Sequence, residues 1–581
     1  MSTRYCHVMA RPSVSPRGLA VARGDEPADL LITGGRVFVS STRSWIETSL
    51  AIADGCIVGW GDRDAIETVD VAGAHLTPAF VDAHMHLEST KLWVDEFVRA
   101  VLPHGTTAVA ADPHEIANVF GIPGVAALIE AATGLPFHFG VCASSCVPAS
   151  PFESAGAELT HTDVADLLDA HGAIGVAEVM NFPGVINGDP EMLARIATAG
   201  TRRVDGHAPG LRGHQLDAYL AAGVESDHEC TLLDEAVEKR MKGMWVFIRQ
   251  GSASKNLDDL IPMVLSGGTD LVAFCTDDRE PDTLRSIGHI NDCCRRAVAA
   301  GVSPEDALIM ASTNPALYHG FTHLGSLAPG YQADILAFDD LSSWRPTTVW
   351  QRGAVVARNG AVTEGLIADT PAPDWMKSSI HLKTALDEAD FALDAPTGDA
   401  KVIGVVGGSL TTSHLTMDAD DASLDIARIA CVERHRETGR VGLGYVSGFG
   451  LERGAIASTV AHDAHNCMTI GHRGASGPAE MAAAVNRLRE IGGGQVVVLD
   501  GEVLAEVRLP IGGLMSDRLA ADVAAELDTL VEAGRRLGIG IEAPFMQLSF
   551  LGLSVIPQLR ITDRGLVDVD RFELTSLAAG D

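Results

Sequence analysis

LTPAFVDAHMH, residues 76–86, is an apolar run that ends in two histidines, His84 and His86. Side chains two positions apart on a β-strand point in the same direction, so both imidazoles are expected at one point at the strand's end. Two imidazoles on a stiff element can clamp a divalent metal ion. A pair of surface histidines in a turn is the alternative, and an isolated His-x-His motif does not separate the two.

Short apolar runs alternate with helix-length segments over residues 77–321. Alternation of this kind predicts an α/β fold with parallel strands. A doubly wound open sheet would alternate in the same way, but a count of eight and the polar residues after each run favour a (β/α)8 TIM-like barrel. The runs that follow the first one, which ends at His86, are 106–110, 137–142, 172–177, 203–206, 223–226, 244–248 and 270–275.

The segments on either side of the expected barrel share a hairpin pattern. Asp54-Gly55 between two apolar runs is typical of a tight β-turn. We therefore expect a small β-sandwich domain built from residues 28–76 and 322–370 together. The runs that support it are 30–39, 49–60, 333–338 and 353–360.

The two ends of the chain differ from this middle part. Residues 1–27 contain four arginines, with prolines at 12 and 16, but no apolar stretch, so we expect a flexible leader, with a presequence as the alternative. Beyond residue 375, apolar runs such as 401–406, 441–446 and 495–499 predict an additional C-terminal α/β domain over 375–581.

The composition restricts the classes of partner. The 581 residues carry 43 Lys and Arg against 77 Asp and Glu, a net charge of -34. This balance disfavours nucleic acid and anionic membrane surfaces, which require a basic footprint, and no apolar stretch is long enough to span a bilayer. The ten cysteines lack zinc-ribbon spacing, which favours reduced thiols in a cytoplasmic protein. The only support for a homo-oligomer is that homo-oligomers are common among soluble proteins.

The carboxyl ends of barrel strands are where such folds carry out chemistry. A polar set at these ends predicts a dinuclear metal centre. Two close cations need a shared anionic bridge, which Glu178 can provide. One ion would be held by His84, His86 and Asp277, and the other by His207 and His228. Asp277 is also placed to accept and pass on the proton of the attacking water.

Each of these residues has a structural alternative when it is considered alone. Glu178 could pair with Arg195 or Arg203, Asp277 could cap the following helix, and His207 could be a hydrogen-bonded structural histidine. All these alternatives would have to coincide at strand ends, which favours the metal centre.

Several segments from residue 28 to 575 resemble the adenine deaminase family of the metal-dependent amidohydrolase superfamily. His-x-His marks only the superfamily, whereas Glu178 at the fourth strand end together with HDAHN at 462–466 points to this family. Ala79 and Ala464 stand where Gly and Ser are usual. The other resembling segments are PAFVDAHMHLES (78–89), DPHE (112–115), SCVP (145–148), AEVMN (177–181), GHA (206–208), SDHE (226–229), CTDD (275–278), LPIGGL (509–514) and TDRGLV (562–567).

The resemblance implies hydrolytic deamination of adenine to hypoxanthine and ammonia, as in purine salvage. It also implies two Mn²⁺ or Fe²⁺ ions, with Zn²⁺ possible, and adenine as the small-molecule partner. An amidohydrolase acting on another amino-purine, a cyclic amide or an N-acyl compound is the alternative. A metal-dependent binding protein without turnover is a further rival, and the intact Asp277 argues against it.

Three strand-end residues are candidates for the acid that protonates purine N1, namely His114, Glu115 and Glu229. Candidates for substrate binding are Ser89, Ser145 and Asn181, each of which could equally cap a helix, together with His462 and His465. The two histidines would reach over the barrel mouth. A further metal site or an internal network are their alternatives.

Overall fold

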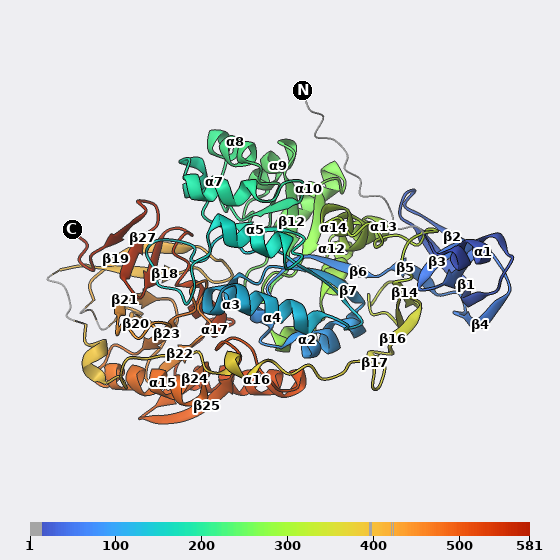
Figure 1. Ribbon diagram of the computed structural model, residues 1–581. Helices are drawn as coiled ribbons and strands as arrows, with labels where there is room; N and C mark the ends of the chain where they lie inside the picture. Colours follow the sequence, from blue (N-terminus) through green and yellow to red (C-terminus); the bar gives the residue numbers. More distant parts are fainter. Residues whose placement is uncertain (1–13, 394–397, 420, 422, 581) are drawn as a thin grey trace.

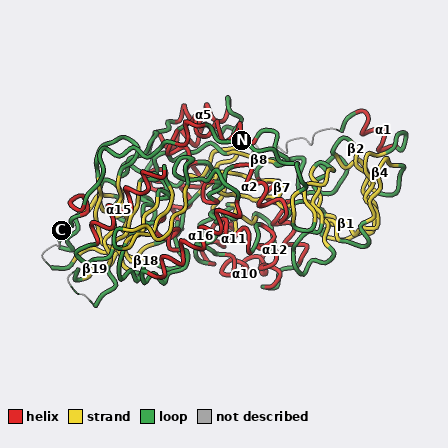
Figure 2. The backbone as a smooth tube through the Cα atoms, turned by 90° about the horizontal axis from the view of Figure 1, so that it is seen from below, coloured by secondary structure: helices red, strands yellow, loops and turns green. Residues whose placement is uncertain are grey.

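The computed structural model describes residues 14–393, 398–419, 421 and 423–580. Three regions lie in a row: a β-rich region at the right-hand end of Figure 1, a barrel in the middle and a C-terminal domain at the left-hand end. The view from below in Figure 2 shows the same order.

The central region is a closed ring of eight parallel strands. Hydrogen-bonded pairing gives three groups of strands, in the orders β6-β7-β8, β9-β10 and β11-β12-β13. Backbone hydrogen bonds join these groups: Ala143 N donates to Gly175 O at 2.8 Å and Glu225 N to Val204 O at 2.9 Å. Met85 and Asp277 form a parallel bridge that returns β13 to β6. The (β/α)8 barrel is therefore confirmed and an open sheet is excluded. Its strands are β6 (Phe80–Met85), β7 (Thr106–Ala111), β8 (His138–Val141), β9 (Gly175–Val179), β10 (Arg203–Gly206), β11 (Ser226–Asp227), β12 (Trp245–Arg249) and β13 (Val272–Cys275).

Helices surround this ring, as Figure 1 shows. Every residue of β6, β7 and β9 is buried, as expected for parallel strands covered on both faces. The helices are α2 (Val94–Val101), α3 (His114–Phe120), α4 (Ile122–Ala132), α5 (His161–Asp169), α6 (Phe182–Ile186), α7 (Pro190–Ala197), α8 (Gly213–Ala222), α9 (Leu233–Met241), α10 (Leu257–Gly267), α11 (Pro281–Ser286), α12 (Ile290–Ala299), α13 (Pro304–Leu308) and α14 (Asn314–Tyr318).

The two segments that flank the barrel join in one nine-stranded sheet. Its order is β17-β16-β15-β14-β5-β1-β2-β3, with β4 beside β1, and the antiparallel pair β14–β5 connects the two segments. The hairpin between β2 and β3 turns at Asp54 and Gly55, both with positive φ, as the tight turn requires. The strands are β1 (Ala28–Val39), β2 (Ser44–Ala53), β3 (Cys56–Trp60), β4 (Ala65–Asp70), β5 (His75–Pro78), β14 (Ile335–Phe338), β15 (Thr348–Gln351), β16 (Ala354–Arg358) and β17 (Ala361–Val362).

Part of the expected flexible leader is a helix, α1 (Pro16–Arg23), which corrects that prediction. Ser15 caps it by accepting from Gly18 N, Gly24 ends it in the left-handed region, and Val21 is fully buried against the β-rich region. An eight-residue helix depends on such packing, because isolated short helices are marginal. Residues 1–13 lie outside the described residues.

The C-terminal domain is built on an eight-stranded sheet of order β19-β18-β21-β20-β23-β22-β24-β25. All its pairs are antiparallel except β18–β21. Helix α15 (Gly477–Ile491) packs against β22, β23 and β24, whereas α16 (Ala520–Arg536) packs against β25 and against α11 of the barrel. The remaining elements are β18 (Ala400–Val405), β19 (Thr412–Met417), β20 (Ala427–Val432), β21 (Val441–Ser447), β22 (Ala455–Ser458), β23 (Cys467–Gly471), β24 (Gly494–Leu499), β25 (Glu502–Arg508), α17 (Pro544–Phe550), β26 (Leu559–Thr562), β27 (Gly565–Asp568) and β28 (Glu573–Thr575).

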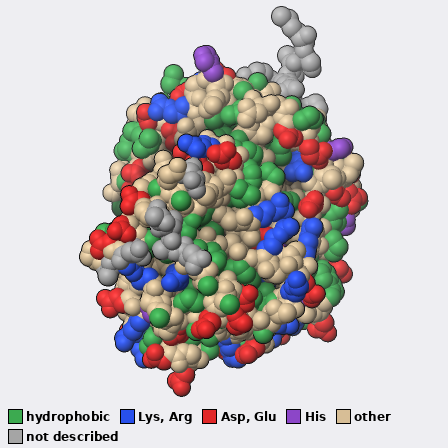
Figure 3. All heavy atoms as spheres, turned by 90° about the vertical axis from the view of Figure 1, so that its left-hand side faces the viewer, with side chains coloured by type: hydrophobic (Ala, Val, Ile, Leu, Met, Phe, Trp, Pro, Cys, Tyr) green, Lys and Arg blue, Asp and Glu red, His purple; other side chains and the backbone are tan. Residues whose placement is uncertain are grey.

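The surface on the C-terminal side carries acidic and basic side chains interspersed with each other (Figure 3). Among the described residues, the helices are all too short or too polar to cross a membrane.

Candidate metal centre

The six side chains expected as metal ligands gather at the carboxyl ends of the barrel strands. Each comes from a strand or from the one or two residues that follow it, and each is at most 5% exposed. The structure therefore brings the whole set together at one mouth of the barrel. The six are His84 in β6, His86 after it, Glu178 in β9, His207 after β10, His228 after β11 and Asp277 after β13.

Glu178 lies between the two expected groups of histidines. Its Oε2 is 2.6 Å from His207 Nδ1 and 3.2 Å from His228 Nε2. Its Oε1 is 3.3 Å from His86 Nε2. One carboxylate thus faces ligands from both groups, which is the arrangement expected of a bridge between two ions.

Asp277 completes the group around the first strand. Its Oδ1 lies 3.0 Å from His86 Nε2 and 3.7 Å from His84 Nε2, and the two Nε2 atoms are 3.3 Å apart. Asp277 has a φ of 54°, and its backbone bonds to His84 O and His86 N close the barrel. A non-glycine residue in the left-handed region is strained, and such strain is common where a side chain must be aimed.

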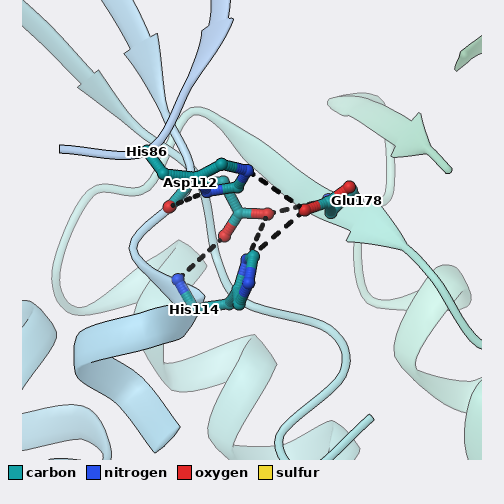
Figure 4. Close-up of side chains that lie close together, drawn as sticks. All are labelled: His86, Asp112, His114 and Glu178. Atoms are coloured by element: carbon teal, nitrogen blue, oxygen red, sulfur yellow. Dashed lines mark hydrogen bonds and ion pairs between the residues drawn. The ribbon is translucent and has the colours of Figure 1, made fainter. Parts of the chain in front are cut away.

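Two residues after β7 extend the cluster beyond the expected ligands. Figure 4 shows Asp112 and His114 pointing toward His86 and Glu178. His114 Nδ1 is 3.4 Å from Glu178 Oε1, and Asp112 accepts hydrogen bonds from the backbone of His114 (3.0 Å) and Glu178 (3.2 Å). The Asp112 carbonyl lies 3.0 Å from His86 Nδ1. Because this acceptor holds the hydrogen on Nδ1, it leaves the lone pair of His86 on Nε2, facing the cluster.

The role of Asp112 was missed from the sequence. Its place at the end of the second strand was visible there, but its contribution is to orient three neighbours, and that depends on contacts between strands.

Arg249, the last residue of β12, was also missed. It is 1% exposed, and its guanidinium contacts Glu229 and Asp277 and lies 3.0 Å from Asp278 Oδ2. One buried cation therefore balances three buried carboxylates, and its planar fork fixes their orientation.

The positive groups of the cluster stabilise the ionised forms of its carboxylates. Burial alone would raise the pKa of Glu178, but His207, His228 and His86 outweigh it and lower that pKa well below its usual value. Burial opposes ionisation of Asp277 too, and Arg249 and His228 lower the pKa of Asp277. Both carboxylates are therefore anionic, as metal binding requires.

The donor set fits divalent ions. Imidazole nitrogens and carboxylate oxygens suit Mn²⁺, Fe²⁺ and Zn²⁺. His207 Nε2 and His228 Nδ1 are buried without a hydrogen-bond partner among the described residues. Ligand atoms lie within 4.8 Å of one another in three overlapping groups, which are His84, His86 and Asp277; His84, Glu178 and His228; and His86, Asp112, His114 and Glu178.

A cavity opens onto this cluster, and the C-terminal domain forms its far wall. Leu410, Phe550 and Leu553, which we call the roof, face the metal ligands, and Met180 adds an apolar side chain from the barrel. His462 and Asp463 complete the wall between the roof and the barrel. The cavity therefore has a charged floor, formed by the metal ligands of the barrel, and a mainly apolar cover from the C-terminal domain.

The expected N1 acids separate into two classes. His114 and Glu229 line the cavity, and Glu229 Oε1 is 3.5 Å from His228 Nε2. Glu115 does not line it. Its Oε1 is 3.6 Å from His462 Nδ1 and its Oε2 is 3.4 Å from His465 Nε2, behind the cavity wall.

Most of the expected substrate-binding residues have other partners. Ser145 donates to Glu178 O at 2.7 Å, and Asn181 caps α6 by accepting from Gly184 N. Ser89 bonds to Glu115 and Asp278 and is fully buried. Of the five candidates only His462 lines the cavity at the metal ligands.

His465 takes part in the internal network instead. Its Nδ1 accepts from Ala461 N at 3.0 Å, so its hydrogen is on Nε2 and points toward Glu115. A nitrogen that carries a hydrogen offers no lone pair to an ion.

Family models match the two larger regions. The model described as "Amidohydrolase family" matches residues 75–371, and that described as "Adenine deaminase C-terminal domain" matches residues 409–573. A protein named "Adenine deaminase" from Desulfatibacillum aliphaticivorans is 43% identical over 96% of this chain and 99% of its own length. "Adenine deaminase 2" from Carboxydothermus hydrogenoformans is 41% identical over 96% of this chain and 98% of its own.

The chain belongs to the adenine deaminase family. Membership of this amidohydrolase family confirms the resemblance noted from the motifs, and it implies divalent metal ions at the cluster. Among solved structures, an L-hydantoinase from Arthrobacter aurescens is similar at 15% identity over 58% of this chain and 97% of its own, with a TM-score of 0.45. An N-acetyl-D-glucosamine-6-phosphate deacetylase from Mycobacterium smegmatis reaches 20% identity over 56% of this chain and 100% of its own, with a TM-score of 0.43.

Proposed function

We propose that this protein hydrolyses adenine to hypoxanthine and ammonia with two divalent ions, Mn²⁺ or Fe²⁺ in preference to Zn²⁺. The observation that carries the proposal is the complete ligand set around Glu178, in a chain matched over nearly its whole length by proteins named adenine deaminase. His84, His86 and Asp277 would hold one ion, His207 and His228 the other, and Glu178 both. The bound ions would act as Lewis acids that make water a nucleophile at neutral pH.

The protein's own residues move the protons. In the reaction a C6–O bond forms, the C6–N bond breaks, and the departing amino group takes up a proton. Asp277 is the acceptor that we assign to the water proton, and the donor that passes it to the amino group, because its carboxylate lies within the ligand cluster. Arg249 holds that carboxylate in place through its contact with Oδ2.

Purine N1 must gain a proton for the ring to accept electron density, and we assign this step to Glu229 or His114, which line the cavity. Glu115 lies behind the wall and supports His462 and His465. The apolar roof excludes water from the substrate, which strengthens every electrostatic contact in the cavity.

The test is turnover by purified protein loaded with Mn²⁺, followed as loss of adenine absorbance together with ammonia release. We expect deamination of adenine at a rate that depends on added metal. Turnover of adenosine, a cyclic amide or an N-acyl compound, with none of adenine, would contradict the proposal.

We further propose a cytoplasmic enzyme with a small-molecule substrate and with neither nucleic acid nor a membrane as partner. The acidic net charge supports the second part. The nine cysteines in the described part of the chain are free thiols, eight of them buried, which suits a reducing compartment.

A further inference from the structure

One carboxylate oxygen in the cavity wall finds no hydrogen-bond partner in the part of the chain that the structure describes. Asp463 is 2% exposed, and its Oδ1 lies 3.2 Å from His114 Nε2. Its Oδ2 is buried without a hydrogen-bond partner among the described residues, and the side chain lines the cavity at the metal ligands. Buried carboxylate oxygens are expected to be satisfied, so this one is available to a donor that enters the cavity.

The neighbouring cations are engaged elsewhere. Arg560 is fully buried, and its guanidinium donates to the carbonyl oxygens of Ile556, Phe550, Leu410 and Pro557. Burial lowers the pKa of Arg560 to about 9, and the charge of Asp463 opposes that shift. Arg560 thus fixes the backbone of the roof and leaves Asp463 Oδ2 unbonded. His462 Nδ1 lies 3.8 Å from Asp463 Oδ1, beyond hydrogen-bond distance.

The position of Asp463 relative to the floor suits a purine. His114 spans the two, because its Nδ1 is 3.4 Å from Glu178 Oε1 and its Nε2 is 3.2 Å from Asp463 Oδ1. One imidazole ring therefore separates Asp463 from the carboxylate beside which C6 must react. In a purine, C6 belongs to the six-membered ring, and the N–H group belongs to the five-membered ring fused to it. A flat ring between the floor and the roof would bring that N–H toward Asp463.

We infer that Asp463 accepts a hydrogen bond from the N–H of the five-membered ring and so selects the free base over its N9-substituted derivatives. The inference rests on the proposed function. A nucleoside carries a carbon at N9 and has no hydrogen to donate there, which would leave a buried carboxylate unpaired. Sites built to bond one donor reject analogues that lack it far more strongly than apolar pockets reject extra bulk.

The experiment compares hypoxanthine with 9-methylhypoxanthine, two product-like probes that the enzyme does not consume. Their binding to the metal-loaded wild type, Asp463→Asn and Asp563→Asn is measured by titration calorimetry, beside turnover of adenine by the wild type. Asp463→Asn keeps an oxygen for His114 and can place an amide donor where the free oxygen was. Asp563→Asn is the matched control, because Asp563 joins the domains through Ser154 (2.9 and 2.7 Å) and lies outside this cavity.

We expect the wild type to prefer hypoxanthine by about 10- to 100-fold, the range for a hydrogen bond to a charged acceptor. Asp463→Asn should remove most of that preference while changing the affinity for 9-methylhypoxanthine by less than about 3-fold. Asp563→Asn should retain the preference.

Three outcomes would overturn the inference. A wild type that binds both probes equally well contradicts it without any variant. Equal weakening of both probes by Asp463→Asn would show that Asp463 acts only by holding His114. An unchanged preference in the folded variant, with its metal content and thermal midpoint preserved, would remove Asp463 from recognition. A wild type that neither deaminates adenine nor binds hypoxanthine overturns the proposed function itself.

Discussion

The floor and the roof of the cavity are held in place by different forces. On the floor, His86, Glu178 and Asp277 lie at the carboxyl ends of barrel strands, and hydrogen bonds of their own backbone position them. On the roof, Leu410 and Phe550 come from distant segments of the C-terminal domain, and Arg560 holds their carbonyl groups. The floor is set by strand register and the roof by one buried cation.

The chemical character of the two surfaces follows the same division. The floor concentrates anions, imidazoles and Arg249, which together suit metal ions and proton transfer. The roof offers apolar side chains, and Asp463 in the wall beside it offers a carboxylate oxygen without a hydrogen-bond partner among the described residues, which suit binding and selection of a ring. Changes to the floor should therefore reduce the chemical step, and changes to the roof should alter affinity.

The largest effect is expected from Glu178→Gln on the floor. A neutral amide cannot bridge two cations, so metal content should fall and kcat/KM for adenine should drop by about 10³-fold or more. Metal analysis by mass spectrometry beside steady-state kinetics checks this. Full metal content and near-normal turnover in the variant would contradict the assignment of Glu178 as the bridge.

A second large effect is expected behind the floor, at Lys239. This side chain is fully buried and lies 3.0 Å from Asp227 Oδ2, 2.6 Å from Glu235 Oε1 and 2.7 Å from Ala208 O. Lys239→Met leaves two buried carboxylates unpaired next to the segments that carry His207 and His228. The free energy of unfolding should fall by about 3 kcal/mol.

Chemical denaturation measures that change, and Lys242→Met provides the control. Lys242 pairs with Asp217 and Glu238 at the surface near the end of the same helix, so its loss should change stability little. Equal effects of the two substitutions would show that the buried pairs do not support the floor.

The floor could be predicted from the sequence because its pattern is local. A two-residue period aims His84 and His86 together, and the apolar runs mark the strand ends that carry the other ligands. The hydrogen-bond partners of loop residues depend on the conformation of the loop, so they could not be predicted in this way. Ser145 and Asn181 were expected to bind substrate, but one bonds to a backbone carbonyl and the other caps a helix.

No periodic pattern in the sequence marks the residues of the roof. Leu410 and Phe550 are separated by 140 positions, and only the folding of the C-terminal domain brings them to one cavity. Helix α1 was missed for a similar reason, since it is stabilised by packing of Val21 and by contacts of Arg17 with Asp29 and Asp54. Long-range packing of this kind is not encoded in spacing.

A moderate effect is expected from Phe550→Leu in the roof. Loss of the aromatic face against the substrate should raise KM for adenine by about 3- to 10-fold while kcat and metal content change little. Phe545→Leu is the matched control, because Phe545 is buried in the same helix and does not line the cavity. If Phe550→Leu reduced kcat and left KM unchanged, the division between floor and roof would be wrong.

The smallest effect, and the most specific, is expected at the junction of the two domains. Glu153, in the loop after β8, is buried and bonds to Ser554 of the C-terminal domain at 3.0 Å and to Ser150 N at 3.2 Å. Burial, with a smaller contribution from Asp463, raises the pKa of Glu153 to about 8. The folded protein therefore keeps a proton on Glu153 over a range in which the unfolded chain has lost it.

The direction of the pH dependence follows from that difference. Where the folded state binds more protons than the unfolded state, stability falls as pH rises, so the contribution of Glu153 is complete below about pH 4.5 and is lost by about pH 8.

Glu153→Gln keeps an acceptor and cannot ionise. Its stability relative to the wild type should rise by about 1 kcal/mol between pH 6 and pH 7, close to the ~1.4 kcal/mol per pH unit that one proton contributes. Denaturation at both pH values measures this, with Glu158→Gln, at an exposed position of the same loop, as the control. A relative stability that is flat or falls with pH would mean that Glu153 is ionised at the junction of the two domains.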